Sequence, residues 1–559
     1  MNTVQTCDES ELVERISRRQ FQEGTPLIDV LISEGVVEVF TLHDHKAGKE
    51  LHRAAMRSVN MPIQGLFEYF GAELGMYYAW VDCYCRMLVI PSVLAIVLLV
   101  IGTGPWGRGM VSHDLEDTLS AIYAFVMIIW ASIFVKVWER EASNNSLNWT
   151  DDTTSDAITD QASANRGDGR VRPGYTGKLR KDPVTGRTEV HFTAKDRRLR
   201  TLVIAPVMVA MIGAAFAVMV FGLNITGYVD EDSPIYYSIL NARNPGTPGM
   251  NYPDDNVIVG LIPTIVHSVA ILLLNLWFAK IAEKMCEYQN WRTQEEFEAS
   301  LILKRVPFEM LASYLSLFYL AFYEGDLSKL KLELQALFMV DTVRRMVMEF
   351  VLPWLLQFRA LKEQLKATDM KKSKSVDESE LEKKVKKAFI KDERVDFDDY
   401  IELTVQFGYI VLFAGAFPIA GFLALAGNVL EMRTDLSKHL HVCRRSASRH
   451  ANNIGPWLPV LKVISDLSVL TNAVIFAYTS RQLDSFMTDD TDFASNANNT
   501  AMRMMAILLT EHILFVIKKV VETEISSIHK TVFTTYQRRD YLRILGLNLF
   551  QAEQQKKHE

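Results

Sequence analysis

The chain has 559 residues, of which 49% are hydrophobic and 23% are charged, and its formal net charge is −7. This balance excludes a strongly basic protein, and we expect no nucleic-acid partner. The apolar residues gather in long stretches that alternate with charged blocks, which is the pattern of a polytopic membrane protein.

The first part of the chain, residues 1–66, is interpreted as a small α+β cytosolic domain. Residues 11–22 have a helical pattern, and residues 28–40 alternate in β-branched side chains. A transmembrane domain is predicted over residues 67–530, and a cytosolic tail over residues 531–559.

Ten stretches are candidate membrane-spanning helices. Five are strongly apolar, namely residues 87–101, 118–135, 202–223, 257–278 and 457–478. Five more carry polar or ionisable groups, namely residues 306–322, 337–358, 400–417, 419–440 and 502–521. Such groups usually face a protein interior or a water-filled path. We therefore predict an all-α membrane protein with ten transmembrane helices.

Basic residues predict how these spans are oriented. Lysine and arginine are concentrated in residues 166–200 and 359–394, whereas the loops on the other side contain few of them. The positive-inside rule then places both termini in the cytoplasm. The sequons at Asn224 and Asn498 fall outside, either as glycosylation acceptors or as chance matches. None of the five cysteines lies in a predicted external loop, so no disulfide framework is implied.

Acidic residues inside the more polar spans are the most informative feature of the sequence. They are Glu349, Asp399, Glu402, Glu431 and Asp435. A carboxylate in hydrocarbon is costly unless it is paired or binds a cation. Carboxylates gathered together repel each other, so a hard cation is their natural counter-charge.

The spacing of these acids predicts that they converge. Pro418 divides two antiparallel spans, and Glu402, Glu431 and Asp435 lie at comparable distances from it. Glu431 and Asp435 are spaced i, i+4, and Asp399 and Glu402 are spaced i, i+3, so each pair shares a helix face. The alternative is that these acids lie at the membrane interface and pair with neighbouring basic side chains.

Three ordered motifs carry a resemblance to a known family. Residues 399–409 read DYIELTVQFGY, residues 428–435 read NVLEMRTD, and residues 453–457 read NIGPW. With these motifs the sequence resembles the anoctamin family of calcium-activated channels and lipid scramblases over residues 60–530. The resemblance implies a homodimer, embedded in the plasma membrane or the endoplasmic reticulum.

The resemblance also implies a calcium site and a groove. Two Ca²⁺ per subunit would be held by acids of the sixth, seventh and eighth spans, which fall on Glu349, Asp399, Glu402, Glu431 and Asp435, with Asn428 nearby. The groove would be bounded by the fourth to sixth spans, with Thr264, Ser268, Asn275, Ser313, Tyr314, Ser316 and Asp341 as its polar lining. For each serine or threonine the alternative is a role in helix packing.

Two residues of the sixth span are assigned to gating. Arg345 stands where the family often has Asn, one turn before Glu349. We expect it either to pair with Glu349 and compete with calcium, or simply to pair with Asp341. The span contains no glycine, so Pro353 is its evident bend point. Asp399 also departs from the family, which often has Glu there.

Three functions are compatible with these features. The first is a calcium-activated phospholipid scramblase that moves lipids passively between leaflets and conducts ions without selectivity, and is therefore not an enzyme. The second is a calcium-activated chloride channel, and the third is a membrane tether or scaffold. Glu309 favours the first over the second, because the anion channels tend to carry Lys at this position and an acid there repels anions.

Overall fold

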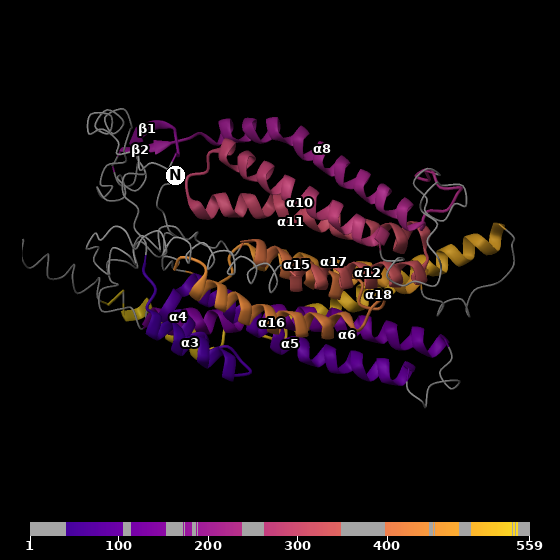
Figure 1. Cartoon of the computed structure of the whole chain (residues 1–559), viewed down its shortest axis with the longest axis horizontal. Coiled ribbons are helices and arrows are strands. Elements are labelled where there is room, and N and C mark those ends of the chain that lie inside the picture. Colours follow the sequence, from indigo (N-terminus) through magenta and orange to yellow (C-terminus); the bar gives the residue numbers. More distant parts are fainter. Residues whose placement is uncertain are drawn as a thin grey trace, which may run out of the picture. The chain divides into compact units, whose positions relative to one another are not determined.

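The structure is a computed structural model, and its described part is almost entirely helical (Figure 1). The described residues are 41–103, 113–151, 172–237 except 173, 182–185 and 187, 262–347, 397–445, 451–479 except 452, and 493–545 except 539 and 543. The chain divides into two compact units, one of residues 1–42 with 158–316 and one of residues 43–157 with 317–559.

The first unit is built around two long apolar helices that pack along each other, α8 (Ala194–Thr226) and α10 (Ile262–Gln289). A short antiparallel hairpin of β1 (Lys178–Lys181) and β2 (Thr188–His191) precedes them. Helix α8 begins where the Thr193 hydroxyl accepts a hydrogen bond from the Asp196 backbone N–H at 3.3 Å, which satisfies a free donor of the first turn. Helix α11 (Gln294–Phe318) starts in this unit.

Helices α8 and α10 are in close contact at a glycine of α8. A β-carbon at Gly222 would lie only 2.3 Å from Cδ2 of His267, and the His267 side chain is buried. The absence of a side chain at Gly222 therefore makes room for the imidazole, as small residues do at helix contacts in membranes.

Substituting Gly222→Ala should destabilise the protein by about 1–3 kcal/mol, because the new methyl group overlaps the buried His267 ring. Thermal unfolding in detergent would measure this change. The matched control is Gly213→Ala on the same helix, where a β-carbon meets nothing within 4 Å. Adding His267→Ala to Gly222→Ala should recover part of the lost stability. Equal effects of alanine at Gly222 and Gly213 would contradict the close contact between Gly222 and His267.

The second unit holds most of the remaining helices. They are α3 (His45–Arg57), α4 (Ile63–Phe70), α5 (Ala72–Thr103), α6 (His113–Asp151), the π-helix η1 (Tyr319–Glu324), α12 (Leu327–Met346), α15 (Phe397–Leu412), α16 (Ala420–His441), α17 (Trp457–Val474), the π-helix η3 (Ile475–Thr479) and α18 (Phe493–Glu524). Helix α5 packs against α6 and α16, and α17 packs against α6, α15 and α18 (Figure 1).

An aromatic stack ties three of these helices together. The ring of Trp80 on α5 lies 5.2 Å from that of Tyr400 on α15, and Tyr400 stacks at 5.2 Å on Trp457, the first residue of α17. Tyr84 and Phe134 extend the cluster toward α6, with ring centroids 5.2 Å apart. Trp80 and Tyr84 are each only 1% exposed, so the stack forms a packed core.

The predicted turn at Pro418 joins α15 to α16. Backbone hydrogen bonds from Ala416 to Phe413 at 3.0 Å and from Ala420 to Phe417 at 3.1 Å close the turn. The Tyr123 hydroxyl on α6 donates to the Pro418 carbonyl at 3.0 Å, which fixes the end of the hairpin. The turn is therefore held both by its own backbone hydrogen bonds and by a contact from α6.

Six described helices are long and apolar enough to cross a membrane. They comprise residues Ala72–Ile101, Thr118–Trp149, Ala194–Thr226, Ile262–Gln289, Gln294–Glu324 and Trp457–Ala477. All five strongly apolar stretches of the sequence lie within or overlap this set, together with residues 306–322. The other four predicted spans overlap α12, α15, α16 and α18, so the number of ten spans stays a prediction. Residues 1–40 lie outside the described residues, and the N-terminal domain also stays a prediction.

The Asn224 sequon is folded into the protein. The Asn224 side chain is fully buried, donates to the carbonyls of Val220 and Ile235 at 2.8 and 2.9 Å, and accepts from the Tyr237 backbone N–H at 2.8 Å. This amide ties the last turn of α8 to the segment that follows the helix and is not presented for glycosylation, which favours the chance match for this sequon.

Candidate functional site

The α15–α16 hairpin presents a buried polar seam between its two helices. Asn428 on α16 donates from Nδ2 to Oε1 of Gln406 on α15 at 2.8 Å, and both side chains are buried. The Asn428 Oδ1 atom is buried and accepts no hydrogen bond from any residue that the structure describes. A buried amide oxygen left open in this way is suited to accept a donor or a cation.

The predicted acids lie on both sides of this seam. Glu431 and Asp435 on α16 are buried, with Asp435 fully so. Asp399 and Glu402 on α15 are half-buried, and the Glu402 side chain is 33% exposed. The fifth acid, Glu349, lies outside the described residues, as does Pro353.

Two arginines of α12 reach into the acidic cluster. Arg345 lies 3.0 Å from Asp341, 3.4 Å from Glu431 and 3.8 Å from Glu402, and it also donates to the Glu402 backbone carbonyl at 3.1 Å. Arg344 lies 2.7 Å from Asp341 and 3.2 Å from Glu402. Three helices, α12, α15 and α16, therefore converge here through ion pairs between their side chains.

The predicted pair of Arg345 with Asp341 is present, but it is part of a larger network. Arg345 shares its guanidinium among three carboxylates, and its predicted partner Glu349 falls outside the described residues. A further cation comes from α16 itself, where Lys438 lies 3.3 Å from Asp435. The chain thus supplies its own counter-charges to these buried acids.

The donor set suits a hard cation. The carboxylates of Glu402, Glu431 and Asp435 and the open Asn428 amide oxygen are the oxygen ligands that Ca²⁺ prefers. Among the described residues, no three acidic, histidine or cysteine side chains are grouped closely enough to hold a metal ion. The calcium site therefore stays a prediction, and its donor chemistry fits the ion.

The polar residues predicted to line a groove lie on α10, α11 and α12. Thr264, Ser313, Tyr314 and Ser316 are buried, and Ser268, Asn275 and Asp341 are half-buried. On α10, Ser268 and Asn275 are spaced i, i+7 and so share a face. Their Oγ and Oδ1 atoms find no hydrogen-bond partner among the residues that the structure places.

Glu309 does not present a bare negative charge. Its carboxylate lies 2.8 Å from the Arg305 guanidinium, and both side chains are largely buried. Because the pair is close to neutral, Glu309 repels anions less than the sequence alone suggests.

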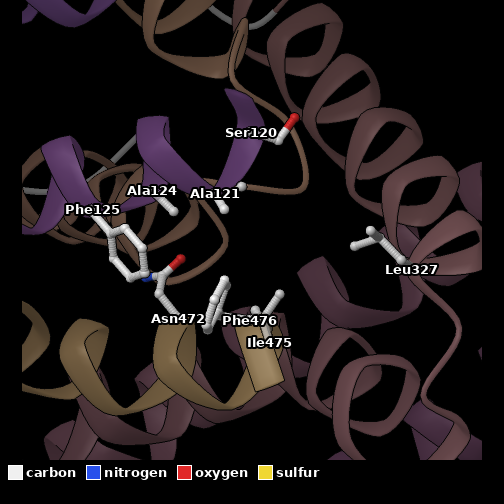
Figure 2. A pocket seen from close by; sticks show the side chains of 9 residues that line it. Ser120, Ala121, Ala124, Phe125, Leu327, Asn472, Ile475 and Phe476 are labelled. Carbon is white, nitrogen blue, oxygen red and sulfur yellow. The ribbon is translucent and has the colours of Figure 1, made fainter. Parts of the chain in front are cut away.

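A small pocket lies elsewhere in the second unit, between α6, the α15–α16 turn and η3 (Figure 2). Ser120, Phe125, Leu327 and Phe476 line it, and the Asn472 amide borders it. The Asn472 Nδ2 donates to the carbonyls of Val411 and Ser468, both at 2.8 Å, so this residue fastens α17 to α15. The pocket has no carboxylate in its lining and is no candidate for the calcium site.

Sequence reasoning missed several charged contacts. Arg344 reaches Glu402 on another helix, and no local spacing could indicate this. By contrast, the spacing i, i+3 along one helix could have indicated the pair of Arg344 with Asp341. On α17 and α18, Lys518 pairs with Asp466 at 2.5 Å, and this contact too joins separate helices.

Comparison with known proteins decides the family. Residues 66–539 match the family described as "Anoctamin: Calcium-activated chloride channel", which is most of the chain. The chain belongs to the anoctamin family. It is thus a multi-pass integral membrane protein of a family that includes scramblases and chloride channels.

Individual anoctamins are similar over much of their length. Anoctamin-10 of Mus musculus is 26% identical over 508 residues, which cover 89% of this chain and 69% of the relative. Anoctamin-10 of Danio rerio is 25% identical over 551 residues, covering 97% and 77% respectively. Anoctamin-4 of Homo sapiens is 25% identical over 550 residues, covering 84% and 56%. The chain therefore spans between 56% and 77% of the length of these three relatives.

Proposed function

We propose that this anoctamin is a calcium-activated phospholipid scramblase that also conducts ions without selectivity. It would act as a homodimer with both termini in the cytoplasm and with two Ca²⁺ per subunit. Lipids would move passively along a polar groove, with their headgroups in the groove and their tails in the bilayer.

The observation that carries this proposal is the polar face of α10. This helix is apolar enough to span a membrane, yet the Ser268 Oγ and Asn275 Oδ1 atoms on one face are buried and have no hydrogen-bond partner among the described residues. An unsatisfied polar atom at membrane depth is costly unless water or a polar ligand can meet it. Opening this face to hydrated headgroups would satisfy both atoms.

The acidic cluster supplies the regulation in this proposal. Glu402, Glu431, Asp435 and the Asn428 amide would hold calcium together with Glu349 and Asp399. Bound calcium would supply positive charge that offsets the repulsion among these carboxylates. The residues of α12 would then respond, because Arg344 and Arg345 already join this helix to α15 and α16.

A calcium-activated chloride channel is the second candidate. The sequence argument against this channel was the negative charge of Glu309. The Arg305–Glu309 ion pair weakens that argument, because Arg305 neutralises the charge. The family description also names chloride channels. A membrane tether or scaffold would need neither the polar face of α10 nor the acidic cluster.

Purified protein in liposomes should exchange fluorescent phospholipids between leaflets when Ca²⁺ is added, without ATP and with little headgroup selectivity. A passive groove contacts the headgroup only through general polar groups, so it distinguishes headgroups weakly. Dithionite quenching of labelled phosphatidylcholine, phosphatidylserine and phosphatidylethanolamine measures the exchange, and ion flux is recorded from the same vesicles.

The variants for this assay come from one helix. Asn275→Leu should slow lipid exchange, whereas Leu276→Ala at the neighbouring lipid-accessible position, 55% exposed, should not. Anion current without lipid exchange would show that the protein is a channel and not a scramblase. The absence of both activities at every calcium concentration would favour the tether.

A further inference from the structure

Arg345 is a buried cation held by three acids. Its side chain is 11% exposed, and its guanidinium contacts Asp341, Glu402 and Glu431 on three different helices. A charge at this burial is costly unless it is paired, and here three carboxylates pair with it. Two of those carboxylates, Glu402 and Glu431, are among the groups to which the proposed function assigns calcium.

The contacts of Arg345 differ in strength. The Nε atom lies 3.0 Å from Asp341 Oδ2, whereas Nη1 is 3.4 Å from Glu431 Oε2 and Nε is 3.8 Å from Glu402 Oε2. Asp341 is on the same helix as Arg345, at i, i+4, so this pair can persist whatever happens at α15 and α16. The contacts to the Glu402 and Glu431 carboxylates are longer and join different helices, and Nη2 also donates to the Glu402 backbone carbonyl at 3.1 Å.

We propose that Arg345 is a tethered cation that occupies the acidic cluster in the absence of calcium and competes with calcium for Glu402 and Glu431. The proposal rests on the calcium-binding role assigned to these acids. When calcium binds, the guanidinium withdraws to Asp341, which already holds it by the shortest contact. Asp341 is thus a resting place for the displaced arginine.

Arg344 also contacts the acidic cluster, but its role in competing with calcium is smaller than that of Arg345. It pairs with Asp341 and Glu402 but forms no ion pair with Glu431 in the described part of the structure, and its side chain is more exposed, at 28% against 11% for Arg345. Removing Arg344 should therefore weaken the competition less than removing Arg345.

The test compares calcium binding to purified wild-type protein and to Arg345→Gln, by calorimetry and by the melting temperature in EGTA and in Ca²⁺. We expect Arg345→Gln to bind calcium about fivefold or more tightly, which is the lower range of measured couplings between sites. Its melting temperature in EGTA should fall, because Glu402 and Glu431 each lose one positively charged partner, and calcium should raise it by more than in wild type.

Arg433→Gln is the matched control. It removes the same charge from α16, two residues after Glu431, but Arg433 donates to the backbone carbonyls of Val429, Ser58 and Val59. Its calcium affinity should equal that of wild type. An equal shift in Arg433→Gln would show a general charge effect and overturn the proposal, as would an unchanged or weaker affinity in Arg345→Gln.

Two further variants keep the test decisive. If Arg345→Gln fails to fold, Arg345→Lys replaces it: the shorter ammonium cannot span Asp341 and Glu431 together, so calcium should bind more tightly than in wild type. Arg344→Gln should shift affinity in the same direction by less. A larger shift in Arg344→Gln than in the Arg345 variants would contradict the assignment.

Failure of this proposal is distinguishable from failure of the proposed function. If Arg345→Gln binds calcium more tightly in a protein that moves neither lipid nor ions, the role of Arg345 as a competitor is supported and the scramblase function is contradicted. If wild type and Arg345→Gln both exchange lipid with the same calcium dependence, the scramblase function is supported and the role of Arg345 as a competitor is contradicted. No calcium binding by either protein would overturn the competitor.

Discussion

Substituting Trp80→Ala should lower the free energy of unfolding by about 3–5 kcal/mol, the range for deleting a large aromatic side chain from a core. The Trp80 ring is 1% exposed and packs against Tyr400 and Tyr84, with centroids 5.2 and 6.3 Å away. Its removal leaves a cavity where α5 meets α15. Unfolding in detergent, followed by temperature or denaturant, measures the loss.

Two controls separate packing from other causes. Trp80→Phe keeps an aromatic ring and removes an indole N–H that has no hydrogen-bond partner among the described residues, so it should cost much less. Trp277→Ala on α10 removes a ring that is 70% exposed and should have little effect. A Trp80→Ala protein as stable as Trp277→Ala would contradict the role of the aromatic stack.

The membrane helices were predictable from the sequence where their apolar residues are continuous. Their ends were not, as α5 shows: hydropathy predicted a span over residues 87–101, but the helix begins at Ala72. The earlier turns carry Asp82 and Arg86, which pair at 2.9 Å, and Asp82 also accepts from the Met61 backbone N–H at 3.0 Å. Contacts within the protein satisfy these charges, and a hydropathy pattern contains no information about such contacts.

The candidate site was predictable in its residue types and only partly in its partners. The turn at Pro418 and the helical spacing indicated that Glu402 and Glu431 approach each other, and both contact Arg345. The pairing of Arg345 with Asp341 also followed from spacing along one helix. Its contacts with α15 and α16 depend on how three helices pack, and no local pattern encodes that packing.

Neutralising the acids one at a time tests their role in calcium binding. Glu402→Gln and Asp435→Asn should each lower the apparent calcium affinity at least about tenfold, or about 1.4 kcal/mol. Each change removes a charged oxygen donor from the proposed site, and Asp435 lies fully buried on α16. Calcium-dependent lipid exchange and calorimetric binding measure the shift.

Asp398→Asn is the matched control, because Asp398 lies in the first turn of the same helix as Glu402 but is exposed to solvent. It removes an equal charge and should leave the calcium affinity close to wild type. Glu402→Gln also removes a carboxylate partner of Arg344 and of Arg345, whereas Asp435→Asn removes the partner of Lys438. A loss of affinity in both variants therefore points to the carboxylates themselves, since the cations that they release differ. Unchanged calcium dependence in both would remove these acids from the site.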